Sequence, residues 1–437
     1  MPQVYINTSF GRSELPGAGE APLHFKSMTP GSSNIKEGRP GYASALRASP
    51  EGRMINSGII AVTFTPDEGA PTIHYTTDCS EPTEDDPIVT GPVFPVGDAS
   101  GGAVLRARAF QDGLWPGPIC TNTYLIGAGP AGDLPVFSLV TEPDNLWDWQ
   151  TGIHVLGPNA GSPPWYDGAN FWNNWERPLH VEFFENDRTR VVGIDLGTKI
   201  HGNFSRTHPQ KSFRLIARGG YGEGSIEHAF FDDVESDSFK TLLLRNSGND
   251  YLYANCRDPL IHLVAEGTDI DDQAYRPALV YLNGEYWGLM GLRERIDEDY
   301  LENHYDVDPD RVDLLEFGGS VVEGSSDRYF EMLQYATAND LSDDAHFAVI
   351  ESMMDTHNYA KYVAHQVWCN NTDWPQNNIK FWRPQGPDGR WRWILYDTDF
   401  GLGLWGGPAT NNALARLFDA NQWYNTLFIN LMENEAF

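Results

Sequence analysis

Aspartate and asparagine side chains near the C-terminal end of the chain have a spacing that is typical of a catalytic site. Asp373 and Asn378 stand five positions apart, and Asp397 and Asp399 follow further along the chain. A carboxylate can accept the proton of an attacking hydroxyl group. Carboxylate and amide oxygens are also ligands that suit Mg²⁺. These residues therefore predict a general base beside a metal site.

The surrounding sequence supplies the elements that would position these residues. Aromatic and β-branched residues predict strands over 379–382 and 391–396, and a Pro- and Gly-rich turn joins them. A helix is predicted over 358–368, just before Asp373. Protein kinases place a D-x-x-x-x-N loop, a hairpin and a D-F-G acid in this order, and Asp399 begins D-F-G here. The alternative is a hairpin whose acids only cap helices and form turns.

Composition limits the classes of partner. The 437 residues carry a formal net charge of −31, which argues against nucleic acid or an anionic membrane as the main partner. No run of apolar residues is long enough for a membrane span, and no signal peptide opens the chain. The four cysteines lack the C-x-x-C spacing of a zinc site. This length predicts two or three domains.

The front of the chain is interpreted as three segments. Residues 1–49 are rich in Gly, Pro and Ser and are expected to form an extended arm or the remnant of an upstream domain. Short, regularly spaced strands predict a small β-sandwich over 50–127, of the immunoglobulin or fibronectin kind. Residues 128–133 are interpreted as a linker, after which the main domain runs over 134–437.

The predicted sandwich resembles a known domain. Residues 75–83 read Y-T-T-D-C-S-E-P-T, which is similar to the Y-T-x-D-G-S-x-P-T motif of the chitobiase/β-hexosaminidase C-terminal-type domain, with Cys79 in place of Gly. The resemblance implies a spacer or adhesion module that contacts a cell surface or polysaccharide. Because Cys120 lies in the last strand region of the same domain, Cys79 and Cys120 either form a disulfide or remain two buried thiols.

A stronger resemblance begins at Leu134. The chain resembles the CotH family of spore-coat-protein-H-like kinases in segments that share their order with the family: I-H-G-N-F-S-R at 200–206, P-Q-K-S-F-R-L at 209–215, L-L-L-R-N-S-G-N-D at 242–250, V-Y-L-N-G-E-Y-W-G at 280–288, L-R-E-R-I-D at 292–297, and the Asp373 and Asp397 blocks. The resemblance implies an α+β, atypical protein-kinase-like fold. It also implies phosphorylation of secreted, surface or spore-coat proteins by a bacterial kinase that uses ATP and Mg²⁺. Residues 427–434 are expected to form a helix that has not ended where the sequence stops at residue 437. The chain is therefore interpreted as a fragment of a longer protein.

Within this resemblance, a cation beneath a phosphate-covering turn is expected. Lys211 follows the turn that contains Ser205 and Arg206. We expect the backbone N–H groups of this turn, Lys211 and Arg206 to bind phosphate. The alternative for Lys211 is a surface position at a sheet edge. Glu294 stands at the hinge position, where adenine would be recognised, and a helix over 258–266 stands where a kinase has its αC helix, with Glu266 as partner of Lys211.

The same resemblance assigns the acidic residues. Asp373 is expected to be the catalytic base, and Asn378 a metal ligand. Asp397, the first residue after a predicted strand, is preferred as principal metal ligand, with Asp399 on a second metal or a water of its shell. A function of another class stays open: a non-catalytic adhesion or glycan-binding protein built on a degenerate kinase fold. Lys211, Asp373, Asn378 and Asp397 together favour the kinase.

Overall fold

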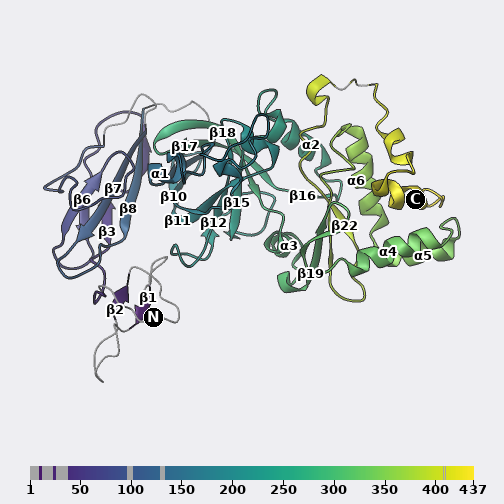
Figure 1. The fold of residues 1–437 in the computed structure, drawn as a ribbon, viewed down its shortest axis with the longest axis horizontal. Coiled ribbons are helices and arrows are strands. Elements are labelled where there is room, and N and C mark those ends of the chain that lie inside the picture. The colour runs from purple at the N-terminus through teal and green to yellow at the C-terminus, as the bar shows by residue number, and fades with distance from the viewer. Residues whose placement is uncertain are drawn as a thin grey trace.

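Three β-sheet units follow one another along the longest axis of the molecule in the computed structural model (Figure 1). A sandwich lies nearest the N-terminus, a closed barrel lies in the middle, and a mixed sheet covered by helices forms the C-terminal end. The structure describes residues 38–95, 102–127, 133–406, 408 and 410–437, together with two short paired strands, β1 (Ser9–Gly11) and β2 (Leu23–Phe25).

The sandwich packs a two-stranded sheet on a four-stranded sheet. The first pairs β3 (Leu46–Ser49) with β5 (Thr63–Pro66), and the second has the order β4 (Arg53–Ile55), β8 (Ile119–Ile126), β7 (Gly102–Phe110), β6 (Thr72–Thr76). Buried residues of both sheets, such as Phe64 and Leu105, form one core. Strand β3 begins inside the segment expected to be an arm, and most of that segment lies outside the described residues.

The cysteines of the sandwich are not joined. Cys79 and Cys120 are both free thiols, so the disulfide alternative is wrong for this structure. Cys79 is 3% exposed and packs against Val104 and Val140, whereas the sulfur of Cys120 accepts a hydrogen bond from the Asn122 amide at 3.3 Å. Burial raises the pKa of the Cys120 thiol to about 11, which keeps the thiol protonated.

The barrel contains seven strands. Its closed order is β10 (Arg177–Phe184), β11 (Arg190–His201), β12 (Ser212–Ile216), β15 (Thr241–Arg245), β18 (Glu285–Glu294), β17 (Tyr275–Leu282), β9 (Val136–Val140). All neighbouring pairs are antiparallel except β9 with β17. The turn between β17 and β18 has φ of +51° at Asn283 and +83° at Gly284, the two positive values of the type I′ turn that Asn-Gly favours.

The sandwich and the barrel share an interface with both polar and apolar contacts. The fully buried carboxylate of Glu182 on β10 accepts a hydrogen bond from the Thr123 backbone N–H at 2.6 Å and pairs with Arg190 at 2.7 Å. Leu125 of the sandwich packs in one cluster with Leu279 of the barrel. Of the expected linker over 128–133, only residue 133 lies among the described residues.

The C-terminal unit is a five-stranded sheet with helices on both faces. Its order is β16 (Asp271–Asp272), β22 (Arg392–Leu395), β21 (Lys380–Pro384), β19 (Val312–Glu316), β20 (Ser320–Glu323). Phe381 and Leu395 pack in one cluster with residues of α4 (Asp327–Ala338), α5 (Asp344–Met353), α6 (Thr356–Trp368) and α7 (Thr426–Leu431). Trp382 and Ile394 pack instead in a cluster with α3 (Glu298–Tyr305), as the alternation along a strand requires.

Helices and sheets are therefore both present in separate layers, which is the expected α+β class. The predicted strands over 379–382 and 391–396 correspond to β21 and β22, and the helix over 358–368 to α6. None of the helices among the described residues is long and apolar enough to cross a membrane. The remaining elements are α1 (Pro143–Trp147), α2 (Arg257–Ala265), β13 (Ile226–Glu227), β14 (Ser238–Phe239), and the 3₁₀ turns η1 (Asn170–Trp172), η2 (Phe204–Thr207), η3 (Gly248–Asp250), η4 (Pro309–Arg311), η5 (Leu404–Gly406), η6 (Leu414–Phe418) and η7 (Trp423–Asn425).

Candidate active site

A cavity of about 720 Å³ lies between the barrel and the five-stranded sheet. The two sides contribute residues of opposite charge. The barrel and the segments that leave it contribute His201, Ser205, Ser212, Arg214, Leu243, Arg245, Arg293 and Arg295. The sheet and its loops contribute Glu316, Asp373, Asn377, Asn378, Tyr396, Asp397 and Asp399, together with Lys380.

The loop between α6 and β21 brings Asp373 and Asn378 together. The Asn378 amide donates hydrogen bonds to Asp373 Oδ2 and to the backbone oxygen of Asp397, both at 3.1 Å. Asn371, which is fully buried, accepts a hydrogen bond from the Asp373 backbone N–H at 3.1 Å and thereby fixes the start of the loop. One amide side chain therefore connects the predicted base to the strand end that carries the predicted metal ligand.

The environment of Asp373 raises the basicity of its carboxylate. Burial, and after it the charge of Asp397, raise the pKa of Asp373, while hydrogen bonds from Asn377 and Asn378 act in the opposite direction. A raised pKa makes the carboxylate a stronger base than an exposed aspartate.

Asp397 and Asp399 follow β22 and differ in their access to the cavity. The Asp397 side chain is 35% exposed and pairs with Arg245, whereas Asp399 is 1% exposed and accepts a hydrogen bond from the Asn249 backbone N–H at 2.6 Å. Burial first, and the charge of Asp397 next, raise the pKa of Asp399 to about 8. Oδ1 of Asp399 is buried and has no hydrogen-bond partner in the described part of the chain.

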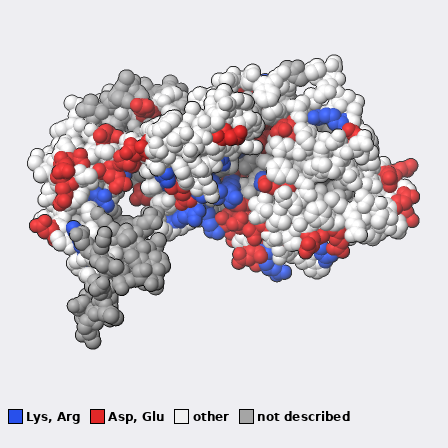
Figure 2. Space-filling view, viewed as in Figure 1, with Lys and Arg blue, Asp and Glu red and all other residues white. Residues whose placement is uncertain are grey.

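The opposite wall is cationic because three strands of the barrel align their side chains. Arg214 on β12, Leu243 on β15 and Arg293 on β18 are cross-strand neighbours, so they project from the same face. Burial, with the charges of Arg245 and Arg206 next, lowers the pKa of His201 to about 3, which keeps this ring neutral. Figure 2 shows Lys and Arg gathered at the middle of the visible face, near β11 and β12 of Figure 1.

The arginines of this wall are not equivalent. Arg245 and Arg293 both pair with Asp258, a buried residue of α2, and Arg245 also meets Asp397. Burial alone would raise the pKa of Asp258, but Arg293 and Arg245 hold it well below its ordinary value. Arg214 lacks such a partner: its Nε is buried without a hydrogen bond among the described residues, and burial lowers its pKa to about 10.

Two of the predicted phosphate-binding side chains lie outside the cavity wall. Lys211 is 4% exposed, and its ammonium donates hydrogen bonds to the backbone oxygens of Arg206 at 2.7 Å and His208 at 2.8 Å. It also lies 4.4 Å from the centre of the Phe171 ring. The Arg206 guanidinium likewise turns to the backbone oxygens of Gly202 and Phe171. Both cations hold the η2 turn, and Ser205 of that turn does line the cavity.

Glu294 also lies outside the cavity wall, although Arg293 and Arg295 on either side of it line the cavity. Its carboxylate is buried and bonds with His304 at 2.6 Å. Glu266, the expected partner of Lys211, is exposed at the end of α2, and Asp258 is the acid that α2 directs to the arginines.

Sequence alone thus predicted the acidic wall, which is the sheet side of the cavity. It did not predict the cationic wall, which is the barrel side with its arginines. Arg214, Arg245 and Arg293 stood in the quoted segments without a role. The alternation Ser212, Arg214 against Phe213, Leu215 marked the polar face of one strand, but the alignment of three strands required the barrel.

The residues present fit a nucleotide and its metal. No group of three or more His, Cys, Asp or Glu side chains suited to a metal ion occurs in the described ranges. Mg²⁺ in nucleotide sites needs only one or two carboxylates, because phosphate oxygens and waters complete its shell. The unpaired Oδ1 of Asp399 and the exposed carboxylate of Asp397 could take part, and Arg214 could meet an anion.

Comparison with protein families identifies the family of the chain. A search of curated proteins found none that matches the chain. The model of the family described as CotH kinase protein matches residues 198–437, which include β12, both walls of the cavity and the helices α2 to α7. The match covers more than half of the 437 residues, so the chain belongs to the CotH kinase family.

Proposed function

We propose that the chain is an ATP- and Mg²⁺-dependent protein kinase that transfers the γ-phosphate to hydroxyl side chains of secreted, surface or spore-coat proteins. The observation that carries the proposal is the cavity itself. Asp373, Asn378 and Asp397 meet on one wall, and the arginines of the barrel face them from the other. Phosphoryl transfer needs this combination of a base, metal-binding oxygens and cations around one nucleotide.

Asp373 is the base in this proposal. Its raised pKa suits it to accept the proton of the acceptor hydroxyl, and the Asn377 and Asn378 amides orient the carboxylate through hydrogen bonds at 2.9 and 3.1 Å to Oδ2. Asp373 Oδ1 is then the atom left for the hydroxyl.

Asn378 and Asp397 hold the principal metal ion, and Asp399 holds a second ion or a water of the shell. A bound Mg²⁺ would neutralise the charge of the phosphates. Asp397 is preferred as principal ligand because its carboxylate is more accessible than that of Asp399, which the Asn249 N–H already holds. Arg245 pairs with Asp397 and holds this carboxylate at the cavity wall.

We assign the phosphate contact to Arg214 and to the turn that contains Ser205, and the positioning of that turn to Lys211 and Arg206. Arg214 is a half-buried cation whose buried Nε has no hydrogen-bond partner among the described residues, whereas Lys211 donates to the backbone oxygens of Arg206 and His208. A guanidinium without a partner gains most from a phosphate.

Calorimetric titration of ATP and AMP, with and without Mg²⁺, tests the proposal. Arg214→Gln should weaken ATP binding about tenfold to a hundredfold, since it removes a charge-assisted hydrogen bond. AMP binding should change less. Arg218→Gln is the matched control, because Arg218 is 55% exposed and lies outside the cavity wall. Wild-type protein that binds ATP no better with Mg²⁺ than without it would contradict the proposal.

A further inference from the structure

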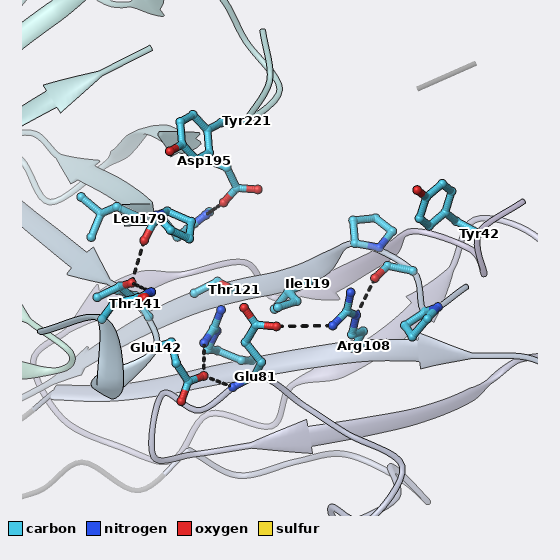
Figure 3. A pocket seen from close by; sticks show the side chains of 18 of the residues that line it. Tyr42, Glu81, Arg108, Ile119, Thr121, Thr141, Glu142, Leu179, Asp195 and Tyr221 are labelled. Carbon is cyan, nitrogen blue, oxygen red and sulfur yellow. Dashed lines mark hydrogen bonds and ion pairs between the residues drawn. The ribbon is translucent and has the colours of Figure 1, made fainter. Parts of the chain in front are cut away.

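A second cavity, of about 370 Å³, lies between the sandwich and the barrel. Strands β7 and β8 of the sandwich form one side, and β9, β10 and the segment after β12 form the other. Figure 3 shows Glu81 and Glu142 on one side of this cavity, Asp195 and Tyr221 across from them, and Ile119 and Thr121 between. Pockets of this size at domain interfaces are common positions for small-molecule sites.

The apolar part of the lining comes from both units. Trp115, Pro116 and Ile119 belong to the sandwich, and Leu179 and Tyr221 to the barrel. The indole of Trp115 is held in place by a hydrogen bond from its Nε1 to the His24 backbone oxygen at 2.8 Å. These rings and aliphatic groups offer the C–H faces of a ligand an apolar surface to cover.

The charged part of the lining is internally paired. Arg106 pairs with Glu142 at 3.7 Å, and Arg108 with Glu81 at 3.6 Å. A third pair joins His180 to Asp195 at 2.7 Å. Three carboxylates against two guanidinium groups leave no excess positive charge for an anion. Each of these three carboxylates is also paired with a guanidinium group or a histidine ring, so the lining does not favour a cationic ligand.

The paired carboxylates still have acceptor capacity for a neutral ligand. A carboxylate has about four lone-pair positions. Glu142 uses one oxygen for the Glu81 backbone N–H at 2.6 Å and for Arg106, and the side chains of Glu81 and Asp195 remain about half exposed at 49% and 54%. Acceptors on two opposite sides suit a ligand that carries O–H donors around its rim.

We propose that this cavity binds a neutral, hydroxyl-rich small molecule of the size of a mono- or disaccharide. The apolar lining covers the C–H faces of the sugar ring, and the carboxylates of Glu81, Glu142 and Asp195 accept hydrogen bonds from its hydroxyl groups. This sugar site is separate from the cavity that contains Asp373, and it does not depend on phosphoryl transfer.

Ligand-observed NMR on the whole chain tests the sugar site with glucose, N-acetylglucosamine, cellobiose and chitobiose, and with glucuronate as an anionic control. At least one neutral sugar should bind at millimolar concentration or better, and more tightly than glucuronate. Ile119→Trp fills the cavity and should weaken binding at least about tenfold. Ile119→Val, which leaves the cavity open, should bind like the wild type.

A second pair of variants covers the case in which Ile119→Trp does not fold. Glu81→Gln should weaken sugar binding several-fold, whereas Glu84→Gln, an exposed residue outside the lining, should not. The sugar site is overturned if none of the four neutral sugars binds wild-type protein, if glucuronate binds more tightly, or if both Ile119→Trp and Glu81→Gln bind like the wild type.

Discussion

Asp399 should reduce the stability of the metal-free protein, and its replacement by Asn should increase that stability in a pH-dependent way. The carboxylate is buried beside Asp397, and its pKa rises from 3.8 to about 8. A group whose pKa is raised by folding contributes stability below its unfolded pKa and loses that contribution as the pH rises toward the folded value. Asn keeps the size of the side chain and can still accept the Asn249 N–H.

The size of this gain in stability follows from the shift in the pKa of Asp399. Each pKa unit corresponds to about 1.4 kcal/mol, so Asp399→Asn should gain about 3 kcal/mol more at about pH 8.5 than at about pH 5.5. For a unit of this size that difference is roughly 6 °C or more in melting temperature. Calorimetry of both proteins in chelator at the two pH values measures it, and comparison at each pH cancels the titration of the other carboxylates.

Asp258→Asn is the matched control, because it makes the same chemical change in the same cluster. The pKa of Asp258 is held well below its usual range, so its contribution is present above the unfolded pKa and is lost only in acid. This variant should therefore be destabilised at both pH values, by about 3–5 kcal/mol, since it breaks a buried ion pair. A melting temperature of Asp399→Asn that falls at pH 8.5, or rises equally at both pH values, would refute the reasoning.

Three further predictions concern positioning and packing. Lys211→Met should lower stability by about 1–3 kcal/mol, because the backbone oxygens of Arg206 and His208 lose their donor, yet it should weaken ATP binding less than Arg214→Gln in the same titration. Glu182→Gln should lower the calorimetric melting temperature by removing a buried charge at the sandwich–barrel interface; an unchanged value would show that this contact contributes little. Cys79 and Cys120 should both react with an alkylating reagent after denaturation without reductant, and a mass that shows them linked would contradict the free thiols.

The acidic wall was predictable because its residues lie close together in the sequence. Asp373 and Asn378 lie in one loop, and the hairpin of β21 and β22 returns the chain to Asp397 within a short stretch of sequence. Aromatic strands and a turn rich in Pro and Gly specify that hairpin without help from the rest of the molecule.

The cationic wall was not predictable in the same way. Sequence predicted that Lys211 lies next to the turn. It did not predict the direction of the side chain, whose ammonium lies over the ring of Phe171, a residue from a distant segment. Arg214 and Arg293, on either side of Leu243, come to the same face only when β12, β15 and β18 pair within the closed barrel. Contacts between strands far apart in sequence leave no local pattern to read.

The place of Glu294 shows an intermediate case. Alternation along a strand predicts that Glu294 and its neighbours point to opposite faces, and the structure has Arg293 and Arg295 at the cavity and Glu294 with His304. Sequence could therefore predict that Glu294 and Arg293 point to opposite faces of the strand, but only the structure identified which of the two faces lines the cavity.

The most direct test of the proposed kinase is transfer of labelled phosphate from ATP by the wild type, Asp373→Asn and Asp397→Asn, to the protein itself and to casein. Asp373→Asn should bind Mg²⁺ and ATP nearly as the wild type does, while transfer falls about 10²–10⁴-fold through loss of the base. Asp397→Asn should lose both transfer and the Mg²⁺ dependence of ATP binding. Transfer at the wild-type rate by both variants, or a wild type that binds no ATP, would contradict the account.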